Sequence, residues 1–134
     1  MQRWLAEGDY ERARSEAAAR GWTLLEADAL RALGRYQDAA NRYDRLASRG
    51  NGTAAFEAAQ LRFQRLDDPG GALGSLQAAP APAALEERRL GLEARLLVRL
   101  GRSADARALA ERYLERHPEG GLARWMTELR DGAE

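Results

Sequence analysis

The chain has 134 residues, which is the size of one domain, and 45% of them are hydrophobic, enough to bury a core. Its 21 arginines balance 21 acidic residues, so the positive field that draws proteins onto nucleic acid is missing. The absence of lysine excludes P-loop and Schiff-base chemistry, and the absence of cysteine with a single histidine excludes thiolate and two-histidine metal sites. We therefore expect no enzyme activity, no cofactor and no metal in this chain.

The composition favours helix along the whole chain. Ala, Arg and Leu dominate, whereas Val and Ile, which favour strands, are nearly absent. No stretch approaches the ~20 apolar residues that a membrane-spanning helix needs, so we expect no membrane insertion. The sequence predicts an all-α protein.

A turn followed by a helix rich in small residues recurs four times. The four segments begin at Gly8, Gly34, Asp67 and Gly101, and each has Ala five residues later. The successive intervals are 26, 33 and 34 residues, and the last two are close to the period of helix–turn–helix repeats. Because the first interval is short by about two helical turns, it predicts a shortened first repeat.

Apolar residues spaced three and four apart, with Gly and Pro between the segments, predict nine helices. They lie near 2–7, 9–19, 22–33, 36–48, 53–66, 70–78, 83–100, 103–116 and 121–131. They form hairpins near 1–20, 21–50, 52–80 and 83–118, and the helix at 121–131 ends the chain. Asp68 and Ser103 stand where helix N-caps are expected. The helix near 70–78 is predicted to be the least stable, because it holds three glycines.

The pattern Gly34, Tyr36, Ala39 and Tyr43 resembles the tetratricopeptide repeat family, in which a Gly-x-Tyr turn precedes a small Ala and a later aromatic residue. The first unit repeats it with Gly8, Tyr10 and Ala13, and the last with Gly101, Ala106 and Pro118. The resemblance covers nearly the whole chain. It implies a single domain over 1–134, a right-handed α-α superhelix of about four hairpins plus a C-terminal helix. The third turn, which reads Asp-Asp-Pro-Gly, departs from the family's pattern.

The resemblance also implies a protein-interaction scaffold or adaptor, whose concave surface is lined by the first helix of each hairpin. Carried over by position, that surface holds Leu24, Asp28, Arg31, Glu57, Leu61, Arg65, Arg88, Arg95 and Arg99. Arg outnumbers acid there, and Arg95 with Arg99 forms a like-charge i,i+4 pair that costs roughly 0.2 to 0.5 kcal/mol. This favours an acidic or carboxylate-bearing peptide as the partner. The alternative, which the sequence leaves open, is that Glu111, Glu115 or another neighbour neutralises these arginines.

The bias toward Arg and Ala is typical of a high-GC bacterial genome, and residues 112–120 are similar to repeats of bacterial cell-envelope and regulatory proteins. We expect the chain to be part of a longer protein, in the periplasm or the cytoplasm. One alternative is the helical solenoid of a larger cell-wall enzyme whose catalytic part lies outside this chain. Nucleic-acid binding is a further alternative, which the neutral net charge disfavours. Trp4, in a short first helix, predicts either an upstream repeat or self-association through the N-terminal end.

Residues that are often catalytic have structural explanations here. His117 precedes Pro118 at a predicted helix end, where a basic side chain suits the helix dipole. Asp67 and Asp68 are adjacent in a turn, so their carboxylates diverge instead of forming an acid–base pair. The glycines of 70–74 follow a helix and have no lysine nearby, which excludes a phosphate-binding loop. The three tryptophans are expected to pack between helices and not to form a ligand cage.

Overall fold

The computed structural model describes residues 11–12 and 23–132. Within these ranges every regular element is helical and no strand occurs, which confirms the all-α prediction. The chain divides into two compact units, one ending at Pro80 and the other beginning at Ala81. The turn predicted at Gly8, the tryptophans at 4 and 22, and the N-terminal end proposed for self-association lie outside the described residues. The expectation of one solenoid domain over 1–134 stays a prediction.

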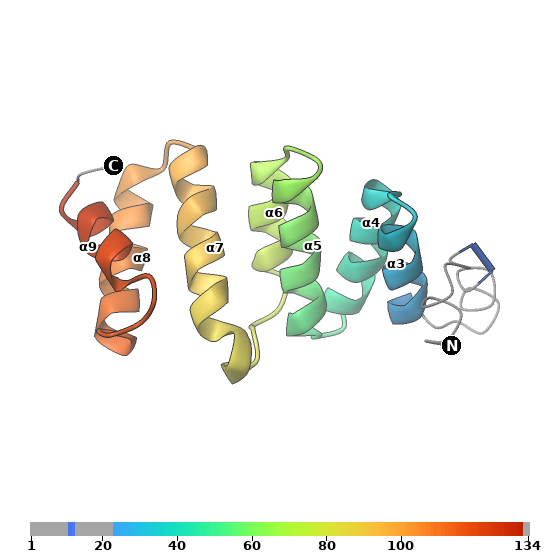
Figure 1. Ribbon diagram of the computed structural model, residues 1–134, viewed down its shortest axis with the longest axis horizontal. Helices are drawn as coiled ribbons and strands as arrows, with labels where there is room; N and C mark the ends of the chain where they lie inside the picture. The colour runs from blue at the N-terminus through green and yellow to red at the C-terminus, as the bar shows by residue number, and fades with distance from the viewer. Residues whose placement is uncertain (1–10, 13–22, 133–134) are drawn as a thin grey trace. The chain divides into compact units, whose positions relative to one another are not determined.

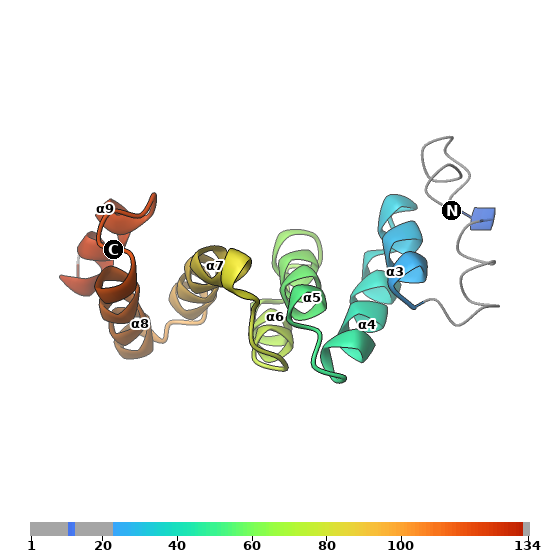
Figure 2. The same cartoon turned by 90° about the horizontal axis from the view of Figure 1, so that it is seen from below.

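The part of the first unit that the structure describes from Thr23 onward contains two helical hairpins. Its helices are α3 (Thr23–Ala32), α4 (Tyr36–Ala47), α5 (Gly52–Gln64) and α6 (Pro69–Leu76). Each helix packs against the next along the chain, and short turns join them (Figure 1). The same side-by-side pairs, α3 with α4 and α5 with α6, are seen from below in Figure 2. The predicted ranges near 22–33, 36–48, 53–66 and 70–78 agree closely with these four helices.

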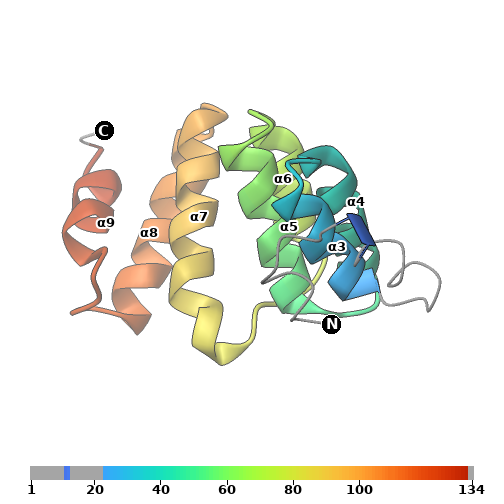
Figure 3. The ribbon, with the colours of Figure 1, turned by 45° about the vertical axis from the view of Figure 1, so that its right-hand side comes forward.

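The second unit contains three helices and one short 3-10 turn. The 3-10 turn η1 (Ala83–Leu85) leads into α7 (Glu86–Arg99), which is followed by α8 (Ser103–Arg116) and α9 (Ala123–Arg130). The central helix α8 packs against both α7 and α9 (Figure 3). The single helix expected near 83–100 is therefore a 3-10 turn followed by an α-helix. None of the helices that the structure describes is long and apolar enough to cross a membrane.

The three described turns of the repeat each contain a residue with positive φ. Gly34 (φ 80), Asp67 (φ 48) and Gly101 (φ 71) all have positive φ, the left-handed region that Gly adopts freely and Asp tolerates better than most residues. The alanines five residues later, at positions 39, 72 and 106, are all fully buried. The recurrence predicted at these three turns therefore corresponds to two shared features, a positive φ and a buried alanine five residues later.

Of the two predicted N-caps, one is confirmed and one is wrong. The carboxylate of Asp68 accepts the backbone N–H of Gly71 at 2.9 Å, so it caps α6 as expected. Ser103 is instead the first residue of α8, and Arg102 occupies the N-cap position without a side-chain cap hydrogen bond. The reason is that Arg102 has a non-helical backbone, with φ −92 and ψ 65, and stands between the left-handed Gly101 and the first residue of the helix.

Alanine-rich cores hold each unit together, and each core has one fully buried tyrosine. In the first unit the core cluster comprises Ala27, Leu30, Ala39, Ala40, Tyr43, Ala54, Ala58 and Leu61. In the second unit the buried residues include Leu97, Ala106, Leu109, Ala110, Tyr113 and Met126. Because alanine is small, the helices approach closely, and Tyr43 and Tyr113 are the largest fully buried side chains.

Candidate functional site

A groove runs over α3 and α5 of the first unit, and all six predicted site residues of this unit line it. It consists of two hollows, of about 450 and 260 Å³, that share Arg31 and Glu57. The larger hollow is lined by residues that include Leu24, Asp28, Arg31, Tyr43, Thr53 and Glu57. The smaller one is lined by Arg31, Tyr36, Glu57, Gln60, Leu61, Gln64 and Arg65. We call the two together the α3–α5 groove, with a Leu24 end and an Arg65 end.

Helical spacing explains why these side chains share one surface. On α5, Thr53, Glu57, Gln60 and Gln64 follow one another at intervals of four, three and four residues, which places them on one helix face. On α3, the groove residues at 24, 28 and 31 are spaced by four and three. The alanines between them turn into the core, so the polar side chains of both helices face the groove.

Arg31 occupies the point where the two hollows meet. Its Nη1 lies 2.7 Å from Oε2 of Glu57, and its Nη2 lies 3.7 Å from Oδ1 of Asp28. Its guanidinium carbon lies 5.7 Å from the centroid of the Tyr43 ring. Burial alone would lower the pKa of Arg31, but the hydrogen bond with Glu57 and the neighbouring carboxylate charges raise it above its ordinary value. Arg31 is therefore a permanent cation that joins α3 to α5.

Tyr43 fixes the carboxylate of Asp28 in the wall of the groove. The tyrosine ring is fully buried, and its hydroxyl donates to Oδ1 of Asp28. Burial, and then this hydrogen bond, raise the pKa of Tyr43 well above its ordinary value, so the hydroxyl stays a neutral donor. Next to this anchored carboxylate, Leu24 has 51% of its surface exposed. The Leu24 end thus combines an apolar surface with a positioned negative charge.

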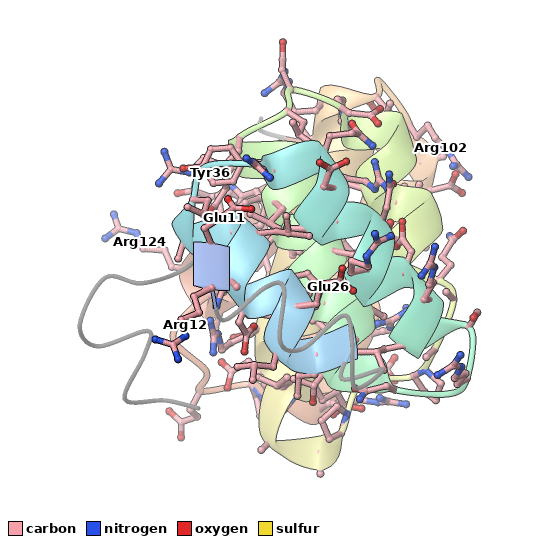
Figure 4. The ribbon with its side chains drawn as sticks, turned by 90° about the vertical axis from the view of Figure 1, so that its right-hand side faces the viewer. Glu11, Arg12, Glu26, Tyr36, Arg102 and Arg124 are labelled. Carbon is pink, nitrogen blue, oxygen red and sulfur yellow. The ribbon has the colours of Figure 1, made fainter. Side chains whose placement is uncertain are left out.

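The Arg65 end presents donors that have no acceptor in the described part of the chain. The guanidinium carbon of Arg65 lies 5.3 Å from the centroid of the Tyr36 ring, and no carboxylate of the described residues pairs with it. Tyr36 is the first residue of α4 and is labelled in Figure 4. The side-chain amides of Gln60 and Gln64 form no hydrogen bond with described residues. A carboxylate is the natural acceptor for such a group of donors.

Sequence reasoning missed seven residues of the groove lining: Tyr36, Tyr43, Asn51, Thr53, Ala54, Gln60 and Gln64. Gln60 and Gln64 lie three and seven residues after Glu57, so helical spacing from that predicted residue was a signal that pointed to them. For Tyr43 no such signal existed, since its contact with Asp28 depends on how α3 and α4 pack.

The three predicted site residues of the second unit lie on α7. Arg88, Arg95 and Arg99 are all exposed, at positions seven and four residues apart along this helix. Glu111 and Glu115 of α8 form no ion pair with Arg95 or Arg99 in the described structure; they line a separate hollow together with Arg130 of α9. The structure therefore does not support these two glutamates as the partners, and the alternative that another neighbour neutralises the α7 arginines stays a prediction, since Arg99 is not without an interaction.

A second polar cluster, not anticipated from the sequence, joins α4, α5 and α6. Nη2 of Arg62 lies 2.6 Å from Oδ2 of Asp44, and its Nε donates to Oγ of Ser75 at 3.2 Å. The hydroxyl of Ser75 in turn donates to Oδ1 of Asp44 at 2.8 Å. Because the serine hydroxyl is buried and already bonded to a charged carboxylate and a guanidinium, the cluster ties helices together and offers no free nucleophile.

Two other residues of catalytic type have close neighbours in the structure. His117 ends α8, with its Nε2 3.5 Å from Oε1 of Glu86 and its ring 5.2 Å from that of Tyr113. Glu26 of α3, shown where this helix meets α4 in Figure 4, pairs with Arg42 at 2.9 Å. Among the residues that the structure describes, no group of acidic and histidine side chains is arranged to hold a metal ion.

Comparisons with known proteins give no match, whether with family models, with curated proteins or with solved structures. The resemblance to tetratricopeptide repeats thus rests on the residues quoted for it. Any function must be argued from the groove and from the α7 arginines.

Proposed function

We propose that the chain is a protein-interaction module, a scaffold or adaptor, in which the α3–α5 groove receives a segment of another protein. The proposal includes the stacking of tetratricopeptide-like hairpins into a right-handed superhelix. It is supported by three turns that each have a residue with positive φ and a fully buried alanine five residues later. Repeated hairpins of this kind commonly present an extended binding surface.

The observation that carries the proposal is the pairing of unsatisfied polar groups with exposed apolar surface in one groove. Arg65, Gln60 and Gln64 offer donors without acceptors among the described residues, and Leu24, at the other end of the same groove, is half exposed. Such a combination is typical of surfaces that a partner covers, since the partner supplies both acceptors and apolar contacts.

The groove carboxylates argue against catalysis at this place. Asp28 accepts the hydroxyl of Tyr43 and lies 3.7 Å from Arg31, and Glu57 lies 2.7 Å from Arg31, so both carboxylates already have partners that hold them in place. An interaction surface therefore fits these residues better than an active site.

Site-specific photo-crosslinking tests the proposal. A photoreactive phenylalanine analogue replaces Gln60 in the groove, or Gln77 at the exposed end of α6 as a matched control. Irradiation of source cells that express either full-length variant should give a discrete protein adduct at position 60 and none at position 77. No adduct at position 60, or the same adducts at both positions, would contradict the proposal.

The α7 arginines are proposed as a separate binding surface, on the second unit, for an acidic or carboxylate-bearing segment, because an exposed guanidinium group can form two hydrogen bonds to one carboxylate. Replacing Arg95 and Arg99 together by Glu should abolish capture of such a partner by the full chain while the helical circular dichroism spectrum stays unchanged. Undiminished capture would exclude these two arginines from binding.

A further inference from the structure

The two ends of the α3–α5 groove carry opposite charge. The lining of the Leu24 end has two carboxylates, those of Asp28 and Glu57, and one guanidinium, that of Arg31. The lining of the Arg65 end has two guanidinium groups, those of Arg31 and Arg65, and one carboxylate, that of Glu57. Because Arg31 and Glu57 are shared and bonded to each other at 2.7 Å, the difference lies in Asp28 and Arg65.

Both of these charges still have bonding capacity. Oδ1 of Asp28 accepts the hydroxyl of Tyr43 and lies 3.7 Å from Arg31, and Oδ2 has no partner among the described residues. The guanidinium carbon of Arg65 lies 5.3 Å from the centroid of the Tyr36 ring, and its N–H donors have no acceptor among the described residues. Each end of the groove thus holds one oriented charge that a ligand can reach.

The length of the groove sets the size of the segment that spans it. On α5 the lining residues run from Thr53 to Gln64, which is roughly 16 Å at the ~1.5 Å rise of an α-helix. An extended peptide advances ~3.3 Å per residue, so about five residues cover this length.

From these features we infer that the occupant of the groove is an extended partner segment of mixed charge. A Lys or Arg side chain lies at the Leu24 end, with its aliphatic stem on Leu24 and its charge on Asp28. About four residues away, an Asp or Glu side chain or a C-terminal carboxylate bonds to Arg65 and to the amides of Gln60 and Gln64. This inference rests on the proposed function, because it names the partner chemistry of the same groove.

A uniformly acidic segment fits this groove less well. Its negative charge at the Leu24 end would face the carboxylates of Asp28 and Glu57, and like charges brought together at an interface weaken binding. A uniformly basic segment meets the same difficulty at Arg65. The groove therefore selects by the spacing and sign of two charges.

A displayed library of random heptapeptides, selected on the immobilised full chain and read by sequencing, tests the inference. The enriched peptides should carry a cation and a carboxylate about four positions apart more often than the unselected library does. Arg65→Glu should replace the preference for a carboxylate by a preference for a second cation, and Asp28→Asn should remove the preference for the cation alone. Arg45→Glu, an exposed change of the same charge on α4 outside the groove lining, should leave both preferences unchanged.

A synthetic peptide from the selection then shows how strongly each substitution changes the binding affinity. Its affinity, measured by fluorescence anisotropy, should fall roughly tenfold or more in Arg65→Glu and stay the same in Arg45→Glu, since a charge-assisted hydrogen bond is lost only in the first. Enrichment of uniformly acidic or uncharged peptides would overturn the inference and leave the groove as a binding site. Failure of the library to enrich any peptide would overturn the inference and the proposed function of the groove together.

Discussion

The hydroxyl of Tyr113 in α8 donates to Oε2 of Glu87 in α7 at 2.6 Å. The same hydroxyl accepts the backbone N–H of Leu122 at 3.0 Å, and Oε2 of Glu87 also accepts the N–H of Gly121 at 3.2 Å. Since the Tyr113 ring is fully buried, these bonds attach the loop that precedes α9 to both other helices of the second unit. The stability of this unit should therefore depend on a single hydroxyl group.

Tyr113→Phe should lower the free energy of unfolding by about 1 to 3 kcal/mol. The change removes the donor to Glu87 and leaves the partly buried N–H of Leu122 without its acceptor. Urea unfolding followed by circular dichroism measures the loss. Tyr36→Phe serves as the control, because it keeps the ring that stacks on Arg65 and removes a hydroxyl without a hydrogen bond in the described structure. Equal losses in the two variants would contradict the role given to the Tyr113 hydroxyl.

The pKa of Glu87 should respond to the same substitution. The hydrogen bond from Tyr113, aided by the N–H of Gly121 and opposed by partial burial, holds the pKa of Glu87 below its usual value. A lowered folded-state pKa means that the carboxylate stabilises the fold above the unfolded-state pKa, and that this contribution disappears as the pH falls through the folded value. In Tyr113→Phe the pKa of Glu87, followed by NMR of its carboxyl carbon, should rise toward that of an ordinary glutamate. An unchanged pKa would mean that the hydrogen bond from Tyr113 is not the main cause of the lowered pKa of Glu87.

Gly120→Ala should destabilise the protein, whereas Gly121→Ala should change little. A Cβ at position 120 would lie 2.3 Å from the hydroxyl oxygen of Tyr113 and 2.5 Å from Oε2 of Glu87. A Cβ at position 121 would meet nothing within 4 Å, and the alanine keeps the N–H that Glu87 accepts. We expect a loss of about 1 to 3 kcal/mol for the first variant and less than about 0.5 kcal/mol for the second, measured by urea unfolding. Similar values for both would show that the loop yields to the added methyl group.

Gly74→Ala should stabilise α6 by about 0.5 to 1 kcal/mol. Position 74 is exposed within the helix, and a Cβ there would meet nothing within 4 Å, so the change reduces the entropy of the unfolded chain without strain. Gly71→Ala is the contrasting variant, because its Cβ would lie 2.1 Å from Oδ2 of the capping Asp68. Thermal unfolding should therefore shift upward for the first variant and downward for the second.

The glycines of α6 also predict its dynamics. Backbone amides of α6 should exchange with solvent faster than those of residues 90–100 in α7, because α6 is short and has three glycines. Hydrogen–deuterium exchange followed by NMR measures this difference. Equally slow exchange in both helices would show that packing outweighs the low helix propensity of α6.

The helices and turns were readable from the sequence because the forces that set them are local. Apolar residues three and four apart predict α4 and α8 almost to the residue. The turns at Gly34 and Gly101 need a left-handed backbone that glycine adopts without strain. Even the Asp-Asp-Pro-Gly turn was recognisable, since Asp68 caps α6 and Pro69 opens it.

The contacts that give the groove its chemistry were not readable in the same way. Arg31 and Glu57 were both predicted to line the surface, but their bond spans 26 residues and depends on how α3 and α5 are placed by the helix between them. The contact of Ser75 with Asp44 spans 31 residues, and no local pattern marks either partner. Local spacing along a helix tells which side chains share a face, whereas the packing of one helix on another selects which of those side chains meet.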